Sequence, residues 1–451
     1  MAQDQIAVVV LAAGMGTRMK SALPKVMHPI AGQPMVRHLL DTVADLAPGK
    51  VVAVVGPGMD AVAAAVSPHP AVIQADRLGT GHAVGQARGA LQGFEGTVLV
   101  LYGDTPLITA QTLRSMLDCR RAAPHPAVVV LGFRPADTGQ YGRLVVNADG
   151  LQEIVEHKDA SEAQRAITLC NSGVMAVDGA RLFGWIDRLT NANAKGEYYL
   201  TDLVALARAD GLPCGYVEGS EEELLGVNSR VDLAAAEAVA QARLRRAAME
   251  GGATLTDPAS VFLCHDTRLG RDVVIGPQVV FGPGVTVGDN VEIRAFSHLE
   301  GATVADGAII GPFARLRPGA EIGSGAHVGN FVEIKKAVVE TGAKVNHLTY
   351  IGDARIGAKA NIGAGTITCN YDGFGKYRTD IGAGAFIGSN SSLVAPVTVG
   401  DGAIVGAGSV VTRDVAAGAL AVERSKQTER AGWADRFRET RVKETAGRKK
   451  D

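Results

Sequence analysis

The chain has 451 residues, about three times the length of a typical domain, so two or three separate hydrophobic cores are expected. Its 45 Lys and Arg residues nearly balance 47 Asp and Glu residues, which argues against nucleic acid or an anionic membrane as a partner. A hydrophobic fraction of 47% excludes a disordered chain, and the 56 glycines follow no G-X-Y period, which excludes collagen.

Cysteine usage and the N-terminus both point to a cytoplasmic protein. The five cysteines are an odd number without a CxxC pair, so neither a disulfide framework nor a thiolate zinc site is predicted. The apolar run at residues 6–13 is too short to cross a bilayer and follows the acidic Asp4. We therefore expect no signal peptide and no membrane span.

The first half of the chain alternates between apolar runs and helical stretches. Residues 6–11, 51–55 and 98–101 are short, continuously apolar runs, typical of strands buried on both faces. Each is followed by glycine or a helical pattern, which predicts an α/β domain with a largely parallel sheet.

The composition changes near residue 229. Residues 231–250 contain eight alanines, with Asp232 early and several arginines late, and end at Gly251. This pattern predicts an exposed connecting helix without chemistry. The expected domains are residues 1–229, a linker helix at 230–252, and residues 253–451.

A six-residue repeat fills the last part of the chain. This period fits neither a helix nor long hairpins and predicts a β-helix whose aliphatic residues point inward. The residues 363–380 break the repeat and are predicted to form an ejected polar loop, a candidate functional element. The charged tail, residues 424–451, is expected to be exposed or partly disordered. The repeating positions are Ile275, Phe281, Val287, Ile293, Leu299, Ile310, Leu316, Ile322, Val328, Ile334, Ile381, Ile387, Leu393, Val399, Val405 and Val411.

A glycine-rich turn follows the first predicted strand, in the sequence LAAGMGTRM at residues 11–19. Backbone N–H groups at such a turn can approach a phosphate closely. Met19 stands where a dinucleotide fingerprint needs its third glycine, and no Lys-Ser/Thr pair follows as in a P-loop. Arg18 and Lys25 could neutralise a triphosphate, which favours a nucleotide site over an ordinary strand-to-helix turn.

Several further motifs support a family resemblance. The sequence LAAGMGTRMxSxLPK is similar to the signature of sugar-1-phosphate nucleotidyltransferases. Together with the six-residue repeat, residues 6–424 resemble the bacterial bifunctional N-acetylglucosamine-1-phosphate uridylyltransferase / glucosamine-1-phosphate N-acetyltransferase family. Matching segments occur in one order: LGTGHA (78–83), YGDTPL (102–107), YGR (141–143), IVEHKDA (154–160), NSG (171–173), GEYYLTD (196–202) and GVNSR (226–230).

The resemblance implies a fold and two activities. The fold would be an N-terminal Rossmann-like nucleotidyltransferase domain, joined by a helix to a C-terminal left-handed parallel β-helix. Glucosamine-1-phosphate would be acetylated with acetyl coenzyme A. The product would then react with UTP to give pyrophosphate and UDP-N-acetylglucosamine, a precursor in cell wall biogenesis.

Uridylyl transfer joins two polyanions, so it calls for Mg²⁺ on hard oxygen ligands together with Arg and Lys side chains. Asp104, directly after a predicted strand, would by itself more often be a helix N-cap; its motif makes it a metal ligand. The resemblance adds Asn228. Gln140 and Ser172 depart from the family pattern near the sugar contacts. The resemblance assigns UTP contacts to Leu11, Ala12, Ala13, Gly14, Lys25, Gln74, Gly79 and Thr80, amino-sugar contacts to Gly142, Glu156, Asn171 and Thr201, and catalytic charges to Arg18 and Lys25.

Acetyl transfer needs a base, oxyanion donors and a coenzyme A site. Most histidines on a β-helix are structural, but His347 lies 12 residues after Lys335 and 14 before Asn361. If one coil takes roughly 18 residues, these three side chains could share a cleft. The resemblance makes His347 the general base. It assigns Arg317, Lys335, Tyr350, Asn361 and Lys376 to glucosamine-1-phosphate, and Ala364, Asn370, Tyr371, Ser389, Ala407 and Arg424 to acetyl coenzyme A. It also implies a homotrimer.

Two other readings remain open from the sequence. One is a single-activity nucleotide-sugar pyrophosphorylase whose β-helix is structural or regulatory. The other is a non-enzymatic scaffold. His347, Asn370, Tyr371 and Lys376 argue against the first because a structural β-helix does not need them, and Arg18, Lys25 and Asp104 argue against the second.

Overall fold

A computed structural model describes residues 5–193 and 195–447 of the protein. The chain divides into two compact units. The first extends to Ala247 and includes Phe262–His265, and the second comprises Ala248–Val261 and the chain from Asp266 onward.

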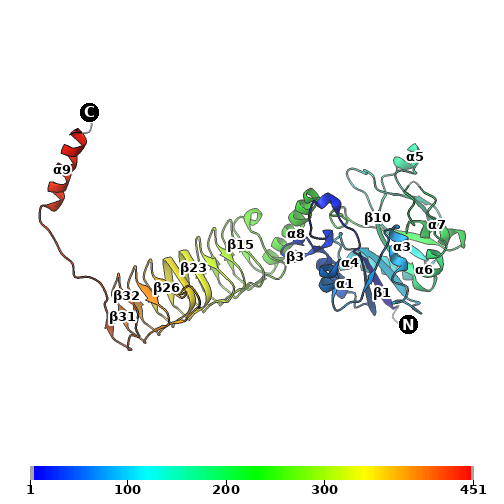
Figure 1. Cartoon of the computed structure of the whole chain (residues 1–451). Coiled ribbons are helices and arrows are strands. Elements are labelled where there is room, and N and C mark those ends of the chain that lie inside the picture. The colour runs from blue at the N-terminus through cyan, green and yellow to red at the C-terminus, as the bar shows by residue number, and fades with distance from the viewer. Residues whose placement is uncertain (1–4, 194, 448–451) are drawn as a thin grey trace. The chain divides into compact units, whose positions relative to one another are not determined.

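A nine-stranded sheet forms the centre of the N-terminal unit (Figure 1). Its strands are β1 (Ile6–Leu11), β4 (Lys50–Val55), β5 (Ala71–Ile73), β6 (Thr97–Tyr102), β7 (Val128–Phe133), β8 (Arg143–Asn147), β9 (Gly150–Val155), β10 (Cys170–Asp178) and β11 (Cys214–Glu218). The main order is β11-β7-β10-β6-β1-β4-β5, and β8 joins β10 to β9. The strands of this main order pair in parallel except β10, which is antiparallel to both neighbours. The prediction of a largely parallel sheet is therefore confirmed, with β1, β4 and β6 at the three apolar runs.

Helices cover both faces of this sheet. The helices of the unit are α1 (Met35–Ala44), α2 (Asp60–Val66), α3 (Thr80–Gly85), α4 (Ala110–Arg121), α5 (Glu162–Arg165), α6 (Gly179–Ile186), α7 (Asp202–Ala209) and α8 (Arg230–Glu250), with short 3-10 turns η1 (Thr17–Met19) and η2 (Lys25–Met27) and the strand pair β2 (Pro29–Ile30) and β3 (Gln33–Pro34). Val8 and Val10 pack with α1, α2 and α4, whereas Ala7 and Val9 pack with α3, α6 and α7. Burial on both faces explains why these strands are continuously apolar.

The alanine-rich helix α8 forms at residues 230–250, as predicted, but it is not exposed all round. Ala236 and Ala240 are buried against Met19, Met35 and other residues of the N-terminal unit. The Gln241 amide also exchanges two hydrogen bonds with the Leu263 backbone, of 2.7 and 2.9 Å. Small alanine side chains permit this close packing, so most of the helix belongs to the N-terminal unit.

The second unit is a parallel β-helix, as predicted, with its coils stacked side by side (Figure 1). A 3-10 turn, η3 (Pro258–Ser260), lies near its start. Its strands are β12 (Thr254–Leu255), β13 (Arg268–Leu269), β14 (Val274–Ile275), β15 (Val280–Phe281), β16 (Thr286–Val287), β17 (Glu292–Ile293), β18 (His298–Leu299), β19 (Ala302–Val304), β20 (Ile309–Ile310), β21 (Arg315–Leu316), β22 (Ala320–Ile322), β23 (His327–Val339), β24 (Lys344–Ile356), β25 (Asn361–Ile362), β26 (Ile367–Cys369), β27 (Thr379–Ile381), β28 (Phe386–Ile387), β29 (Ser392–Val394), β30 (Val397–Val399), β31 (Ile404–Val405), β32 (Val410–Val411) and β33 (Leu420–Ala421).

Most coils advance by 17 or 18 residues, as the pairs His327–Lys344 and Arg268–Thr286 show. All the aliphatic and aromatic positions of the six-residue repeat are buried, which confirms the predicted inward direction. One coil is longer, because β25 pairs with β28 through residues 25 apart, Asn361 and Phe386. The additional residues form a loop at 370–378, between β26 and β27, within the predicted 363–380 segment.

The charged C-terminal tail is exposed, as predicted, through its described residues. It also contains a helix, α9 (Trp433–Gly447), which the sequence analysis did not predict. No helix among the described residues is long and apolar enough to cross a membrane.

Candidate active sites

A cavity of about 290 Å³ opens at the carboxyl ends of β1 and β6. It is lined by the residues that the sequence analysis assigned to UTP and by Asp104 of the metal set: Leu11, Ala12, Ala13, Gly14, Lys25, Gln74, Gly79, Thr80 and Asp104. Residues that the sequence analysis missed also line it, among them Arg77, Tyr102 and Glu197. This is the edge of an open α/β sheet where ligands bind.

The glycine-rich turn is held in place by its neighbours. Gly16 has φ +67°, and a Cβ atom there would lie 2.5 Å from the Lys25 Cβ atom, so the close approach of these two segments requires glycine. The Arg77 guanidinium donates a 3.1 Å hydrogen bond to the Ala13 carbonyl oxygen. Arg18 lies in η1, is exposed and does not line the cavity, so its catalytic role stays a prediction.

Two oxygen atoms converge on one cation at the floor of the site. The Lys25 ammonium contacts the Asp104 carboxylate and donates a 3.1 Å hydrogen bond to Asn228 Oδ1. Backbone bonds fix this geometry, because the Val227 N–H donates to the Asp104 carbonyl oxygen at 2.9 Å and the Asn228 N–H donates to the Asp232 carboxylate at 3.0 Å. A carboxylate oxygen and an amide oxygen that share one cation fit a hard divalent metal.

Three of the predicted UTP contacts, Gln74, Gly79 and Thr80, lie on one stretch of chain. Gln74 is 4% exposed, and its amide nitrogen donates to the Gly79 carbonyl oxygen at 3.1 Å. The Thr80 hydroxyl accepts a 3.1 Å hydrogen bond from the Leu200 N–H, which ties α3 to the segment before α7. Gln74 is therefore held rigidly at the wall of the cavity.

The predicted sugar residues gather beside β8 and β10. A Cβ atom on Gly142 would lie 3.6 Å from both Glu156 Oε1 and the Asn171 Cβ atom, so these three residues adjoin. The Thr201 hydroxyl is buried without a hydrogen-bond partner among the described residues. A buried hydroxyl of this kind is costly unless a ligand satisfies it. Burial also raises the pKa of Glu156, and the Lys195 ammonium opposes this rise.

Replacing Glu156 by glutamine should stabilise the protein in a pH-dependent way. The native pKa of Glu156 lies above the unfolded value of about 4.3. The free-energy cost of ionising the buried carboxyl is therefore fully present at neutral pH and absent below the unfolded pKa. The Glu156→Gln thermal midpoint should therefore exceed that of wild type at about pH 7.5, and this difference should shrink towards about pH 4.5. Glu153→Gln, at an exposed carboxylate on β9, serves as the control. A Glu156→Gln shift that is the same at both pH values would contradict this explanation.

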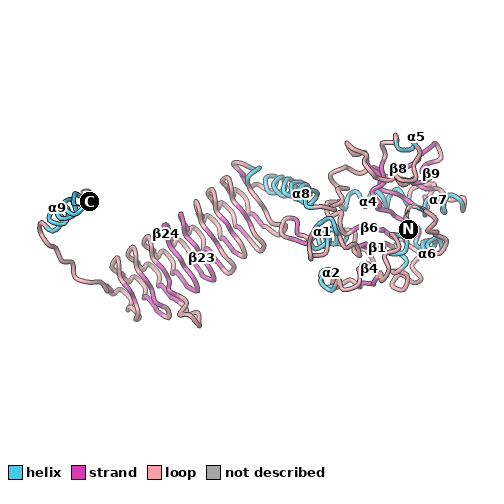
Figure 2. The backbone as a smooth tube through the Cα atoms, turned by 45° about the horizontal axis from the view of Figure 1, so that its top comes forward, coloured by secondary structure: helices cyan, strands magenta, loops and turns pink. Residues whose placement is uncertain are grey.

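Three residues that are predicted for acetyl transfer lie on the long paired strands β23 (Lys335) and β24 (His347 and Tyr350), which Figure 2 shows. His347 is exposed and pairs with Asn330 of the preceding coil. Its Nδ1 atom lies 2.7 Å from Asn330 Oδ1. An amide oxygen can only accept, so Nδ1 carries a proton, and in the neutral imidazole Nε2 then presents a lone pair. The sequence analysis missed Asn330, although it lies one 17-residue coil before His347.

Basic side chains meet at the adjoining part of the coil. Lys335 pairs with Gly352, and contact with the Lys335 ammonium lowers the pKa of Lys376, which belongs to the 370–378 loop. Arg317 forms a 2.7 Å ion pair with Glu333 on the same face. Two ammonium groups that face each other favour an anion such as a phosphate between them.

Tyr350 and Asn370 adjoin through Gly352. A Cβ atom on Gly352 would overlap the Tyr350 hydroxyl and lie 2.7 Å from Asn370 Nδ2. Asn370 Nδ2 donates a 2.5 Å hydrogen bond to Asp353, and this bond anchors the start of the loop. Because Gly352 has no side chain, the side chains of Tyr350 and Asn370, both predicted ligand contacts, can occupy the space beside it.

Gly352→Ala is expected to lower acetyl transfer by about 10²-fold, because both side chains must move away from productive positions. Uridylyl transfer, which is predicted for the other unit, should stay near the wild-type rate and serves as the internal control. Thermal unfolding is measured in parallel. Unchanged acetyl transfer in a folded Gly352→Ala protein would show that neither Tyr350 nor Asn370 positions a substrate.

The predicted acetyl coenzyme A residues occupy successive coils. The Ala364 carbonyl oxygen accepts from the Asn390 N–H at 2.8 Å, next to Ser389, and the Arg424 guanidinium donates to the Ala407 carbonyl oxygen at 2.6 Å. The same row reaches His347, whose carbonyl oxygen accepts from the Gly365 N–H at 3.3 Å. The structure therefore aligns the predicted base with the predicted coenzyme residues. Tyr371 is exposed in the loop, and its hydroxyl donates to the Gly373 carbonyl oxygen at 2.6 Å.

The spacing argument that grouped Lys335, His347 and Asn361 is wrong in detail. Because a coil here takes 17 residues, His347 stacks on Asn330, Lys335 stacks on Gly352, and Asn361 stacks on Lys344. Asn361 therefore lies in a different row from His347, and no hydrogen bond among the described residues joins them. Separations of 12 and 14 residues do not complete a coil.

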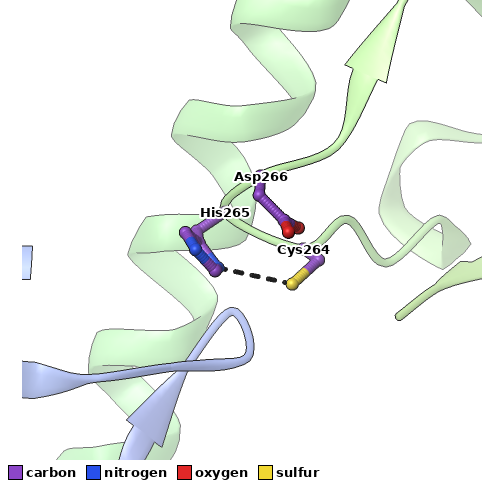
Figure 3. Close-up of side chains that lie close together, drawn as sticks. All are labelled: Cys264, His265 and Asp266. Carbon is purple, nitrogen blue, oxygen red and sulfur yellow. Dashed lines mark hydrogen bonds between the residues drawn. The ribbon is translucent and has the colours of Figure 1, made fainter. Parts of the chain in front are cut away.

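Cys264 and His265 lie together beyond α8, with Asp266 next in the chain (Figure 3). The Cys264 Sγ atom is 3.4 Å from His265 Nδ1. Both atoms also approach the Ala31 carbonyl oxygen, at 3.1 and 3.3 Å. These contacts tie the segment to the turn between β2 and β3, and we assign it no metal.

Family models match both halves of the chain. A MobA-like NTP transferase domain matches residues 8–171. The bacterial transferase hexapeptide repeat matches residues 266–301, 301–336 and 378–413. His347 and residues 370–377 of the loop fall between the last two matches, in residues 337–377.

Curated relatives match nearly the whole chain. The "Bifunctional protein GlmU" of Paramagnetospirillum magneticum is 68% identical over 438 residues, covering 97% of this chain and 98% of that protein. The protein of the same name from Rhodospirillum rubrum is 68% identical, with 96% and 97% covered. That of Rhizorhabdus wittichii is 60% identical over 452 residues, with both chains fully covered.

Proposed function

Because the chain belongs to the family of the bifunctional protein GlmU, we propose which of its residues carry out the two reactions of that family. The chain is an enzyme that acetylates glucosamine-1-phosphate with acetyl coenzyme A and transfers uridylyl from UTP to N-acetylglucosamine-1-phosphate. The observation that carries the assignment is the presence of two separate polar sites, one in each compact unit.

Uridylyl transfer takes place in the N-terminal cavity. The phosphate oxygen of N-acetylglucosamine-1-phosphate attacks the α-phosphorus of UTP and pyrophosphate leaves, so the protein mainly positions the two anions. Asp104 and Asn228 would hold a divalent cation, Mg²⁺, which would supply positive charge to neutralise the phosphates. Lys25 and Arg18 supply further positive charge. Gln74, Gly79, Thr80 and residues 11–14 bind the nucleotide, and Gly142, Glu156, Asn171 and Thr201 bind the sugar.

Acetyl transfer takes place on the β-helix. His347 Nε2 removes a proton from the sugar amine, which attacks the thioester carbonyl and displaces the thiol of coenzyme A. Arg317, Lys335 and Lys376 bind the sugar phosphate, and Tyr350 and Asn361 contact the sugar. Asn370 and Tyr371 lie against the oxyanion and the pantetheine arm. Ala364, Ser389, Ala407 and Arg424 hold the rest of acetyl coenzyme A.

The proposal includes a homotrimer in the cytoplasm. The rings of Phe296, Phe313 and Phe331 stack at 4.9 and 5.1 Å on the outside of the β-helix and are about half exposed, an apolar surface suited to burial against another copy. Light scattering of the purified protein tests the trimer. The five cysteines form no disulfide among the described residues, which supports a reducing compartment.

One assay tests both activities. Glucosamine-1-phosphate, acetyl coenzyme A, UTP and Mg²⁺ are mixed with the protein, and thiol and pyrophosphate release are followed separately. Both products are expected. Pyrophosphate release from added N-acetylglucosamine-1-phosphate without any thiol release would instead support a pyrophosphorylase with a structural β-helix.

A further inference from the structure

Lys25 holds both proposed metal ligands of the nucleotide site. Its Nζ atom contacts the Asp104 carboxylate and lies 3.1 Å from Asn228 Oδ1. The Lys25 and Asp104 side chains are only 13% and 18% exposed, so little water screens this pair. The ammonium thus occupies the point where the two oxygen ligands converge.

The stem of Lys25 is fixed, whereas its end can turn. The Cβ atom packs against the turn at Gly16, and the residue begins η2 directly after Pro24. Beyond Cβ, the side chain is a flexible chain with three rotatable carbon–carbon bonds and a point charge. Lys25 also lines the nucleotide cavity, so its ammonium can turn from the two ligands towards a bound triphosphate.

We propose that Lys25 is an internal cation that competes with the divalent metal for Asp104 and Asn228, so that the metal binds tightly only together with the nucleotide. The inference rests on the proposed metal ligands. A metal at this point must displace the ammonium, because two cations cannot share the same oxygen atoms without strong repulsion. The triphosphate supplies the new counter-charge for the displaced ammonium. Metal and nucleotide then strengthen each other's binding, as linkage requires.

The prediction concerns the affinity of the protein for Mn²⁺ alone, with no nucleotide present. Lys25→Met removes the competing charge with little change in shape and should bind Mn²⁺ about tenfold more tightly than wild type, within the usual range of coupling between sites. Free Mn²⁺ is measured by its paramagnetic resonance signal in titrations of the full chain. Binding that Asp104→Ala abolishes defines the site and separates it from any other Mn²⁺ bound to the protein.

Arg77→Met is the matched control. Arg77 lines the same cavity, but its guanidinium donates to the Ala13 carbonyl oxygen and touches neither metal ligand. If general positive charge weakens metal binding, Arg77→Met should tighten Mn²⁺ binding as much as Lys25→Met does, and the proposal would be wrong. Lys25→Gln, which keeps a hydrogen-bond donor without the charge, repeats the test if Lys25→Met does not fold.

The outcomes separate this inference from the proposed function. One outcome is that Asp104→Ala removes Mn²⁺ binding but neither Lys25 variant strengthens it. This would contradict the proposed competition by Lys25 and would still support the metal site. Mn²⁺ binding that Asp104→Ala leaves unchanged would overturn the metal site itself. Tighter binding in both Lys25 variants, with Arg77→Met like wild type, is the expected result.

Discussion

Replacing Asp104 by alanine is expected to lower pyrophosphate release by about 10³-fold or more, while thiol release from acetyl coenzyme A continues near the wild-type rate. The carboxylate is the charged member of the proposed metal pair, and its partner Asn228 offers only a neutral oxygen. Loss of the carboxylate also leaves the Lys25 ammonium without its anion. Acetyl transfer should not change because its residues lie in the other compact unit.

Asp187→Ala provides a control for loss of an acidic residue. Asp187 forms an exposed ion pair with Arg88, and such pairs contribute little to stability or to a distant site. Both activities of Asp187→Ala should match wild type. If Asp104→Ala lost both activities equally, the two sites would not act independently and the assignment to separate units would be wrong.

Replacing His347 by alanine is expected to lower acetyl transfer by about 10² to 10⁴-fold, the usual range for loss of a general base. The acidic limb of the pH–rate profile for acetyl transfer should flatten, since the proposed general base is gone. Uridylyl transfer from supplied N-acetylglucosamine-1-phosphate should continue. His347 is exposed and makes one side-chain hydrogen bond, to Asn330, so the thermal midpoint should change little.

Asn330→Ala tests whether the hydrogen bond that orients the His347 ring and its proton matters separately from the imidazole itself. Without the Asn330 oxygen, the His347 ring can turn and can carry its proton on either nitrogen. Acetyl transfer should fall, but less than in His347→Ala. A folded His347→Ala protein that acetylates glucosamine-1-phosphate at the wild-type rate would show that His347 is not the general base. A protein that loses activity only in proportion to unfolding would show that the imidazole is structural.

The buried strands and the β-helix could be predicted because the burial of each residue follows from a pattern of neighbouring residues in the sequence. The apolar run of β1 is buried on both faces, and the six-residue positions such as Ile334 and Ile387 all point inward. The buried face of α8 was missed, because alanine at Ala236 and Ala240 looks the same whether it meets solvent or a close neighbour. Alanine-rich helices carry no period from which burial can be inferred.

The contacts around the acetyl-transfer site depend on which residues of neighbouring coils stack. The number of residues between them in the sequence gave this stacking only approximately. The six-residue period predicted a β-helix correctly. The estimate of roughly 18 residues per coil did not show which residues stack, since these coils advance by 17 and His347 stacks on Asn330. Counting back one coil from His347 would have found Asn330. Arg77 belongs to none of the matched segments, and Tyr102 stands in YGDTPL without an assigned role. Their place in the cavity follows from how strands β1, β4, β5 and β6 lie beside one another.

The lengthened coil of the β-helix separates an exposed loop from the buried column of aliphatic residues that stabilises the β-helix. Ile362 pairs with Ile387 across the 370–378 loop just as Val345 pairs with Ile362 one coil earlier, so the buried column continues unbroken. Amino-acid changes in the loop therefore leave the inward-facing aliphatic residues in place. Substitutions in the loop can thus change the contacts to a sugar phosphate while the buried column that stabilises the β-helix stays intact.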